Sequence, residues 1–451
     1  MQPVALSELC RGLGRPAHDP MITSVVTDSR AAGPGSLFVC IKGARVDGHD
    51  YAAAALAQGA AAVLVQHPVD GVPEDRCIRV ADPLDAMIAI GGNYREKFSP
   101  VLVGVTGSVG KTTTKEFCAA VLGAFGKTLK TEGNQNNEIG VPNTLLRLDD
   151  SVRYAVVEMG MQGMGEIEKL TRAARPCGAI ITMIGQSHLE QLGTRENILK
   201  AKMEICLGMP DGAPLVLNAD NDLLCTARVP ARLRRVTFAM ENPDADVRAA
   251  DVRAEAGGTS FTIEDRARGR FAAFIPAVGA HNVMDALSAY ALAASLGLDA
   301  QRAAEALRRF TTTGHRQHLV QCRGVQVLED CYNASPDSMR AGLSALAGLC
   351  VSGRRIAVLG DMFELGPAER EAHRAVGDLC AGAGVDLLVA VGEAMRLACE
   401  RAQQLGVPAV HCADNAEAAA FLRREAKEGD ALLVKASHGM AFEEILRDFY
   451  A

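Results

Sequence analysis

The chain has 451 residues, of which 48% are hydrophobic, 22% are charged and only 4% are aromatic, with no Trp. This length predicts two to four domains. The net charge of −7 argues against a nucleic-acid or anionic-membrane binder, which needs a basic surface. The scarcity of aromatic side chains also argues against stacking platforms for single-stranded nucleic acid.

The 13 cysteines are scattered, and no two are spaced as Cys-x-x-Cys. Cys118, Cys206 and Cys350 fall in apolar stretches, which is typical of small core residues in a reducing compartment. The N-terminus lacks a basic region followed by an apolar run, and no apolar run is long enough to span a bilayer. We therefore expect a cytoplasmic protein without membrane insertion.

Residues 1–99 are expected to form a small α/β domain. Short apolar runs at Ser36–Ile41 and Ala61–Val65 alternate with an Ala-rich helix at Tyr51–Gln58. A charged stretch that ends at Pro100 closes this part.

Residues 100–311 are expected to form a second domain around a parallel sheet. A buried strand at Val101–Val105 leads into a Gly-rich turn and a helix, and further short apolar runs alternate with helical patterns. These runs are Tyr154–Val157, Ala179–Ile184 and Leu215–Leu217. The domain ends with a helix at His281–Leu296, which Gly297 stops, and a shorter helix at Gln301–Phe310.

Residues 312–451 again alternate strands with helices, which predicts a second, Rossmann-like domain. Its expected strands are Ile356–Leu359, Leu387–Val391 and Ala431–Val434. The whole chain is thus expected to be a three-domain α/β protein. Ligands of such sheets bind beyond the carboxyl ends of the strands.

A candidate phosphate-binding loop spans Gly104–Thr114. Glycines at 104, 107 and 110 allow backbone N–H groups to surround phosphates, Lys111 offers a cation, and Thr112 offers a hydroxyl to Mg²⁺. The strict P-loop pattern has Gly where this chain has Val105, which disfavours a generic motor or GTPase. The alternative is a structural turn that contains Gly-Lys-Thr by chance.

Several ordered segments together resemble the Mur ligases. They are Thr27–Arg30, Leu37–Gly43, Asp47–Asp50, Thr106–Glu116, Asn134–Pro142, Glu158–Gly160, Asp330–Met339 and Leu359–Gly366. The resemblance covers essentially the whole chain. It implies a P-loop ATPase domain between an N-terminal UDP-sugar-binding domain and a C-terminal Rossmann-like domain.

The segments are most similar to those of the Mur ligases that add D-alanyl-D-alanine to UDP-N-acetylmuramoyl tripeptide. The resemblance implies an acyl-phosphate intermediate, ATP and Mg²⁺ as cofactors, and these two compounds as substrates; we expect a monomer. Two alternatives stay open: a sister ligase that adds another amino acid, and a P-loop ATPase without ligase activity.

The resemblance also assigns candidate site residues. ATP would be bound by Gly107, Ser108, Val109, Gly110, Lys111, Thr112, Thr113, Asn282 and Arg316. The metal would be held by Thr112, Glu158, His188 and Lys202, and the catalytic groups would be Lys111, Glu158, His188, Lys202 and Arg316. Ser29, Lys42, Asn136 and Asn137 would contact the muramoyl peptide, whereas Asn333 and Asp337 would contact D-alanyl-D-alanine.

Lys202 is also singled out by periodicity alone. On a helix that begins near Thr194 it lies within an apolar face formed by Ile198, Leu199, Met203, Ile205 and Cys206. A buried unpaired ammonium is costly, so Lys202 needs a partner, a route to water or a covalent change. The resemblance implies carbamylation.

Alternatives remain for the other candidates. Glu158 could be a solvated acid, His188 a satisfied polar residue, Asn282 a helix N-cap and Arg316 a surface side chain. The chain also departs from the family pattern at Ser187, Asp285, His315 and His438, where the family more often has Ala, Asn, Gly and Arg.

Overall fold

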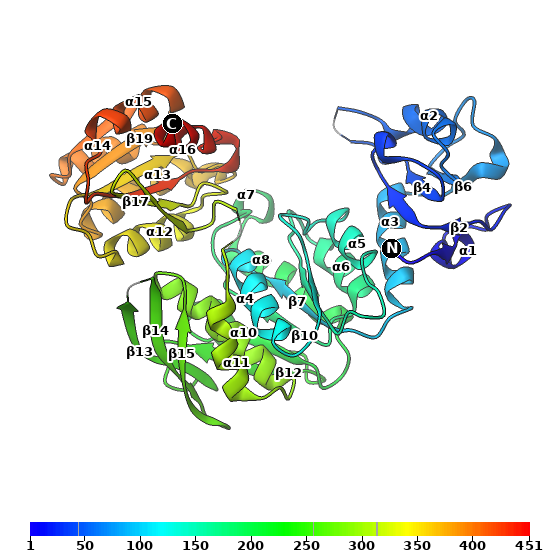
Figure 1. Cartoon of the computed structure of the whole chain (residues 1–451), viewed down its shortest axis with the longest axis horizontal. Coiled ribbons are helices and arrows are strands. Elements are labelled where there is room, and N and C mark those ends of the chain that lie inside the picture. The colour runs from blue at the N-terminus through cyan, green and yellow to red at the C-terminus, as the bar shows by residue number, and fades with distance from the viewer. Residues whose placement is uncertain (44, 256, 313) are drawn as a thin grey trace.

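The computed structural model describes residues 1–43, 45–255, 257–312 and 314–451. The chain forms three α/β bodies in sequence order, as expected, and Figure 1 shows the N-terminal body in blue, the central body in cyan and green, and the C-terminal body in yellow to red. In this described part, no helix has both the length and the apolar character needed to cross a bilayer.

The N-terminal body contains a four-stranded parallel sheet in the order β3-β4-β5-β6 and a separate antiparallel pair, β1 and β2. The expected Ala-rich helix is α2 (Ala52–Ala57). The other elements are β1 (Val4–Ala5), α1 (Leu6–Leu9), β2 (Met21–Ile22), β3 (Ser24–Val26), β4 (Ser36–Val39), β5 (Ala62–Val65) and β6 (Cys77–Arg79).

Helix α3 (Pro83–Arg95) joins this body to the central one. It begins at the N-cap Asp82, whose carboxylate accepts from two backbone N–H groups. Its Gly91 lies close to α5 (Gly140–Leu145), where an added Cβ would be 2.8 Å from Pro142 Cα, so the two helices meet at short range. One apolar core continues from the N-terminal sheet through α3 to the central sheet.

The central sheet has nine strands in the order β15-β14-β13-β12-β11-β10-β7-β9-β8. The run from β8 to β13 is parallel, which agrees with the expected parallel sheet. Its strands are β7 (Val101–Thr106), β8 (Thr128–Lys130), β9 (Tyr154–Glu158), β10 (Gly178–Ile181), β11 (Pro214–Asn218), β12 (Arg234–Ala239) and β13 (Val247–Glu255).

Strands β14 (Gly258–Asp265) and β15 (Gly269–Ile275) extend this sheet with antiparallel pairing. No strand is expected from the sequence over residues 247–275. In β14, buried Phe261 and Ile263 alternate with the partly exposed Thr262 and Glu264. This period of two is typical of an antiparallel sheet with one face near water, and it differs from the continuous apolar runs of the parallel strands.

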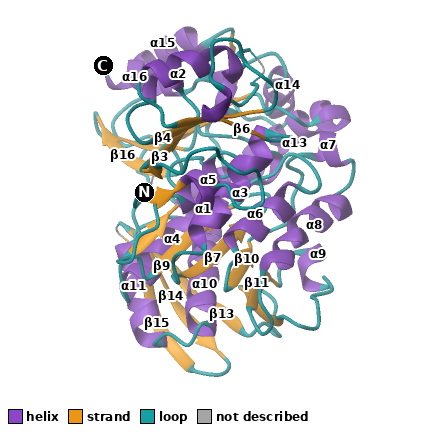
Figure 2. Cartoon of the chain, turned by 90° about the vertical axis from the view of Figure 1, so that its right-hand side faces the viewer, coloured by secondary structure: helices purple, strands orange, loops and turns teal. Residues whose placement is uncertain are grey.

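Helices cover both faces of the central sheet (Figure 2). Helices α4 (Lys111–Gly123), α10 (Ala280–Ser295) and α11 (Ala300–Ala306) lie on one face, and α5, α6 (Glu166–Ala174) and α8 (Arg195–Met203) lie on the other. Two short helices, α7 (Leu189–Leu192) and α9 (Asp222–Cys225), follow β10 and β11. Gly297 adopts a positive φ of 82° just past α10, as expected for a residue that stops a helix.

The C-terminal sheet has the order β16-β17-β21-β18-β19-β20, with only β16 antiparallel among its described strands. Its strands are β16 (His318–Cys322), β17 (Val325–Glu329), β18 (Arg355–Gly360), β19 (Leu387–Val391), β20 (Ala409–Cys412) and β21 (Ala431–Lys435). Helices α12 (Pro336–Gly348), α13 (Glu369–Gly382) and α14 (Arg396–Gln404) pack on one face, and α15 (Asn415–Glu425) and α16 (Glu443–Tyr450) on the other. This matches the expected Rossmann-like arrangement.

Candidate active site

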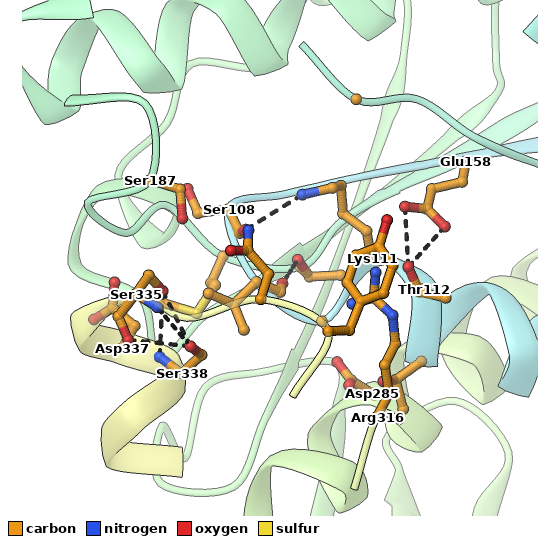
Figure 3. Close-up of a pocket in the computed structure, with 18 of the residues that line it drawn as sticks. Ser108, Lys111, Thr112, Glu158, Ser187, Asp285, Arg316, Ser335, Asp337 and Ser338 are labelled. Carbon is orange, nitrogen blue, oxygen red and sulfur yellow. Dashed lines mark hydrogen bonds between the residues drawn. The ribbon is translucent and has the colours of Figure 1, made fainter. Parts of the chain in front are cut away.

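A cavity of about 620 Å³ lies where the central and C-terminal bodies meet. Its walls come from the carboxyl ends of strands in both sheets: β7, β9, β10 and β11 on the central side, and β17 and β21 on the C-terminal side. Figure 3 shows the central phosphate loop facing the first turn of α12. Because strands of two sheets end here, groups from both bodies can act on one ligand.

The phosphate loop connects β7 to α4, and two of its positions must be glycine for steric reasons. Gly107 has a φ of 152°, and a Cβ there would overlap the hydroxyl of Thr182. Gly110 has a φ of 85°, and a Cβ there would lie 2.6 Å from Asp285 Oδ1. Glycine is therefore required at both positions, and the loop is an ordered strand-to-helix turn.

Lys111 curls over this loop. Its Nζ donates to the carbonyl oxygens of Gly107 at 2.8 Å and Ser108 at 3.2 Å. Burial lowers the pKa of Lys111, and the nearby Arg316 lowers it further, whereas Glu158 opposes the shift. An anion in the loop would relieve the repulsion between the two cations.

Ser108 ties the phosphate loop to the segment after β10. Its backbone N–H donates to the carbonyl oxygen of Met183, and its Oγ accepts from the backbone N–H of Gly185, both at 2.9 Å. This segment continues to Ser187 and His188, which both line the cavity. The phosphate loop and His188 are thus held in a fixed relation.

Glu158 is the last residue of β9 and is 1% exposed. Its carboxylate accepts from Thr112 Oγ1 at 2.9 and 3.1 Å (Figure 3) and from Asn136 Nδ2 at 2.8 Å. The alternative of a solvated acid is wrong, because this carboxylate is buried beside the phosphate loop.

His188 adopts a left-handed backbone conformation with a φ of 64°. Burial, with help from the charges of Lys111 and Lys202, lowers its pKa to about 4, so the ring is neutral at pH 7. Its Nδ1 is buried and has no hydrogen-bond partner in the described chain; Glu364 Oε2 lies 3.5 Å away. The alternative of a satisfied polar residue is therefore wrong, and the ring has a lone pair to offer a ligand.

Lys202 is 1% exposed on α8, so the expected burial is confirmed. The alternative in which its head reaches water is wrong. Burial lowers its pKa well below the usual value, and the charge of Lys111 adds to the shift. No hydrogen bond or ion pair holds its amine within the part of the chain that the structure describes, and it lies outside the wall of the cavity.

Asn282 is buried in the first turn of α10, but it is not the N-cap, which is Gly279. Its Nδ2 donates to the carbonyl oxygen of Val278 at 2.7 Å and to Gln317 Oε1 at 2.9 Å. The N-cap alternative is therefore wrong. Asp285, one turn further along α10, accepts from Thr114 Oγ1 at 3.0 Å and lines the cavity.

Arg316 lies over the ring of Tyr332, with its guanidinium carbon 3.8 Å from the ring centroid. Both residues line the cavity, so the interpretation of Arg316 as a plain surface side chain is wrong. His315, where the family more often has Gly, donates from its Nδ1 to Glu329 Oε2 at 3.0 Å.

Asn333 and Asp337 line the opposite wall of the cavity. Asp337 Oδ2 accepts from the backbone N–H of Gln186 at 3.1 Å and so bridges the two bodies. Beside them Lys435 is 2% exposed, with its Nζ 2.8 Å from Asp330 Oδ2 and 2.9 Å from the carbonyl oxygen of Asn333.

The cavity thus brings together most of the expected site residues: Ser108, Val109, Gly110, Lys111, Thr112, Thr113, Asn136, Asn137, Glu158, His188, Asn282, Arg316, Asn333 and Asp337. Gly107 and Lys202 are not part of the wall. Ser29 and Lys42 are in the N-terminal body, outside this cavity.

Two residues at the cavity were not expected from the sequence: Lys115, whose Nζ lies 3.7 Å from Glu158 Oε2, and Tyr332 in the cavity wall. The signal for Lys115 was present, because position 115 follows Thr112 by one helical turn and therefore faces the same side of α4. No sequence pattern indicates a role for Tyr332, because Arg316, which stacks on it, comes next to it only when the chain folds.

A second group of possible metal ligands, Asp47, His49 and His67, lies in the N-terminal body. The two imidazole rings are stacked with an interplanar angle of 18°, so one ion cannot lie in both ring planes. His49 also uses both nitrogens, Nδ1 with Asp47 at 2.6 Å and Nε2 as acceptor from the backbone N–H of Gln66 at 2.9 Å. This cluster orients a loop and does not offer a metal site.

The chain matches three family models in order: "Mur ligase family, catalytic domain" over residues 21–88, "Mur ligase middle domain" over 105–293 and "Mur ligase, glutamate ligase domain" over 315–438. A Bacillus subtilis protein named UDP-N-acetylmuramoyl-tripeptide--D-alanyl-D-alanine ligase is 37% identical, over 98% of this chain and 97% of its own length. The protein of that name from Escherichia coli is 36% identical, over 95% and 94%.

Solved structures agree with these matches. MurF from Acinetobacter baumannii superposes with a TM-score of 0.90 at 29% identity, covering 100% of this chain and 99% of its own. MurF ligase from Thermotoga maritima, solved in complex with ADP, gives 0.85 at 28% identity, covering 95% and 97%. The fold, the order of the matched domains and the near full-length relatives establish that the chain belongs to the Mur ligase family.

Proposed function

We propose that this protein joins D-alanyl-D-alanine to the terminal carboxyl group of a UDP-N-acetylmuramoyl tripeptide in a reaction driven by ATP. This is the last cytoplasmic step in the assembly of the peptidoglycan precursor peptide. The observation that carries the proposal is the shared cavity, in which a phosphate loop faces polar groups of a second sheet. The near full-length similarity to ligases of this name supports the choice of substrates.

The phosphate loop, residues 107–113, is proposed to hold ATP, with Lys111 and Arg316 directed at its terminal phosphates. Both cations already lie in the cavity wall, and no anion of the described chain neutralises the guanidinium of Arg316 there. Asn282 is proposed to contact the adenine. This role requires its amide to exchange the bond with Gln317 for one with the base.

Magnesium fits the residues present. Thr112 and Glu158 offer hard oxygen donors, and His188 Nδ1 is buried without a hydrogen-bond partner in the described residues. Mg²⁺ would be held by Thr112, Glu158, His188 and a carbamylated Lys202, and it would supply positive charge to phosphate oxygens. The lowered pKa of Lys202 favours the neutral amine, which is the form that reacts with CO₂.

The three bodies are proposed to divide the substrates between them. Residues 1–99, with Ser29 and Lys42, hold the UDP end of the muramoyl peptide, while Asn136 and Asn137 meet its peptide end. Residues 100–311 hold ATP. Residues 312–451 bring D-alanyl-D-alanine through Asn333 and Asp337. Because one chain supplies all these groups, we propose that the working unit is a monomer.

In the proposed reaction the tripeptide carboxylate attacks the γ-phosphorus of ATP, which gives an acyl phosphate and ADP. The free amine of D-alanyl-D-alanine then attacks the acyl carbon, loses a proton and displaces phosphate. Two anions must meet in the first step, so the charges of Lys111 and Arg316 lower its barrier by neutralising the oxygens that face each other.

Asp285→Asn is expected to remove a pH dependence of ATP binding. Burial raises the pKa of Asp285 to about 8, so its carboxyl is neutral at lower pH and charged above. A charge beside Gly110 repels phosphates, and we expect the wild-type ATP KM to rise about fivefold from about pH 7 to about pH 9, a cost of about 1 kcal/mol. The raised pKa also makes the wild-type fold less stable as pH rises toward 8. Steady-state kinetics at several pH values measure the ATP KM. An equal rise of the KM in Asp285→Asn would mean that the charge of Asp285 does not cause it.

The proposed function is tested by phosphate release from ATP and Mg²⁺ with each substrate alone and with both together. We expect release to require the UDP-muramoyl tripeptide and D-alanyl-D-alanine, with one dipeptide added to the product by mass spectrometry. Release without the dipeptide would indicate an ATPase. Release supported by a different amino acid would indicate a sister ligase.

A further inference from the structure

Lys115 is a buried cation beneath the floor of the cavity, and the proposed mechanism does not use it. It lies on α4, one turn after Thr112, and is 0% exposed. Its Nζ lies 3.2 Å from Glu116 Oε1 and 3.7 Å from Glu158 Oε2. A buried ammonium persists only where such carboxylates compensate it, so Lys115 and Glu158 depend on each other.

Lys115 also reaches the segment Gly133–Asn137, here called the asparagine segment because it contains Asn134, Asn136 and Asn137. Lys115 Nζ lies 3.5 Å from the carbonyl oxygen of Gly133, at the start of this segment. At its other end Asn136 Nδ2 donates to Glu158 Oε1 at 2.8 Å. These contacts form a closed ring. Lys115 contacts Glu158, Glu158 accepts from Asn136, and the backbone from Asn136 leads back to Gly133, whose carbonyl oxygen lies near Lys115 Nζ.

The backbone at the end of β9 and just after it anchors the same ring. The N–H of Glu158 donates to Thr131 Oγ1 at 3.1 Å, and the N–H of Gly160 donates to the carbonyl oxygen of Asn136 at 2.8 Å. All three asparagines of the segment line the cavity. The side chain of Lys115 is thus the one charged group, among the described residues, that contacts both the asparagine segment and the carboxylate of Glu158.

We propose that Lys115 is a positioning residue that holds the asparagine segment against Glu158 and thereby sets the affinity for the peptide substrate. Without its charge, the buried carboxylate of Glu158 would lose the ammonium that lies 3.7 Å from its Oε2, and its side chain would move away from Asn136. The bond to Asn136 would then be lost, and the segment would no longer be fixed. This proposal rests on the proposed function for the identity of that substrate.

Lys130 provides a matched control. It lies on β8 and also pairs with Glu116, but its side chain is 35% exposed, and it has no contact with Glu158 or Gly133 in the described structure. Lys130→Met therefore removes one positive charge from the same carboxylate while it leaves the ring closed.

The first test is hydrogen–deuterium exchange of the substrate-free full chain. Lys115→Met is expected to speed exchange of the amides in the segment 131–141 about tenfold or more, because this segment then opens locally. Lys130→Met is expected to leave it unchanged. Unchanged exchange in a folded Lys115→Met, or equal acceleration in both variants, would overturn the proposal.

The second test separates the two substrates. Lys115→Met is expected to raise the KM for the UDP-muramoyl tripeptide about 10–100-fold, by analogy with the loss of metal affinity or activity when a metal ligand loses its outer partner. Metal-free ADP binding should stay within about twofold, since the phosphate loop itself is untouched. A rise in the ADP Kd equal to the rise in the tripeptide KM would overturn the proposal.

Two further variants test whether Lys115 and Asn136 act through the same ring of contacts. If Lys115→Met does not fold, Lys115→Gln keeps a polar group of similar reach and is expected to show the same separation. Asn136→Ala opens the ring at another point, so its combination with the Lys115 variant should raise the tripeptide KM no further than the larger single effect. If the increases in tripeptide KM of the two single variants multiply in the double variant, the two residues act independently, which would contradict the proposal. If the wild type is not a ligase, the proposed function fails, whereas the exchange experiment still decides the role of Lys115.

Discussion

Lys202→Met is expected to slow turnover strongly and at the same time to stabilise the fold. Loss of the proposed metal-holding group should lower kcat by about 10²–10³-fold, as removal of one charge-stabilising group does in other active sites. Methionine fills a similar volume in the buried face of α8 without an unpaired amine. We therefore expect the free energy of unfolding at pH 7 to increase by about 1–4 kcal/mol.

The sign of the accompanying pH effect follows from the lowered pKa of Lys202. Between that pKa and the usual value of 10.5, the unfolded chain binds a proton that the folded chain does not. Wild-type stability should therefore rise with pH in this window, and the methionine variant should lack that contribution. Denaturant unfolding in CO₂-free buffer at several pH values measures both effects.

Lys200→Met is the control, because Lys200 lies on the exposed side of the same helix. It should change neither kcat nor stability appreciably. Full activity in Lys202→Met would contradict the proposed role of Lys202, and a destabilised variant would contradict the idea that its amine is an uncompensated cost. Rescue of Lys202→Ala by short-chain carboxylic acids, and dependence of the wild type on bicarbonate, would support carbamylation.

Glu158→Gln is expected to lower kcat by about 10²–10³-fold at ordinary Mg²⁺ concentration, with partial recovery at high Mg²⁺. The amide keeps the size of the side chain, but it removes the charge that Thr112 and Asn136 orient and that Lys115 balances. The variant should also be less stable by about 1–3 kcal/mol, because Lys115 loses a counter-charge in a buried site.

The measurement is turnover over a range of Mg²⁺ concentrations, with thermal unfolding in parallel. Glu138→Gln is the matched control: Glu138 lines the same cavity, but its nearest described cation is the half-exposed Lys169 at 3.4 Å. A similar loss in both variants would mean that the overall charge of the cavity matters and not the position of Glu158.

The sequence predicted the fold well where one local pattern decides the structure. The apolar runs at Val101–Val105 and Tyr154–Val157 became β7 and β9, and the helix expected near Thr194 begins with Thr194 as N-cap. The strands at 247–275 were missed because their alternating polar residues resemble a loop until a neighbouring strand supplies the second face. Whether such a segment forms a strand depends on packing against the neighbouring strand, which the spacing of residues in the sequence does not show.

The same distinction applies to the site. The burial of Lys202 could be predicted, because its apolar neighbours repeat on one helix. The stacking of Arg316 on Tyr332 could not, because the partner lies in another element. The family pattern indicated which residues meet. The structure excludes two alternatives that the sequence left open, Asn282 as an N-cap and Lys202 as a side chain that reaches water. The roles of the individual site residues remain predictions.

The strand order of the C-terminal sheet has a consequence for how the molecule is made. Strand β21 follows the other described strands of this sheet in the sequence, yet it lies between β17 and β18 in the middle of the sheet. While the chain is being synthesised, these two strands have no neighbour on their facing edges, and unpaired edges are prone to join other chains. Lys435, at the end of β21, arrives with the same strand. The far wall of the cavity and the protection of the nascent sheet against aggregation are therefore completed together, once β21 has been synthesised.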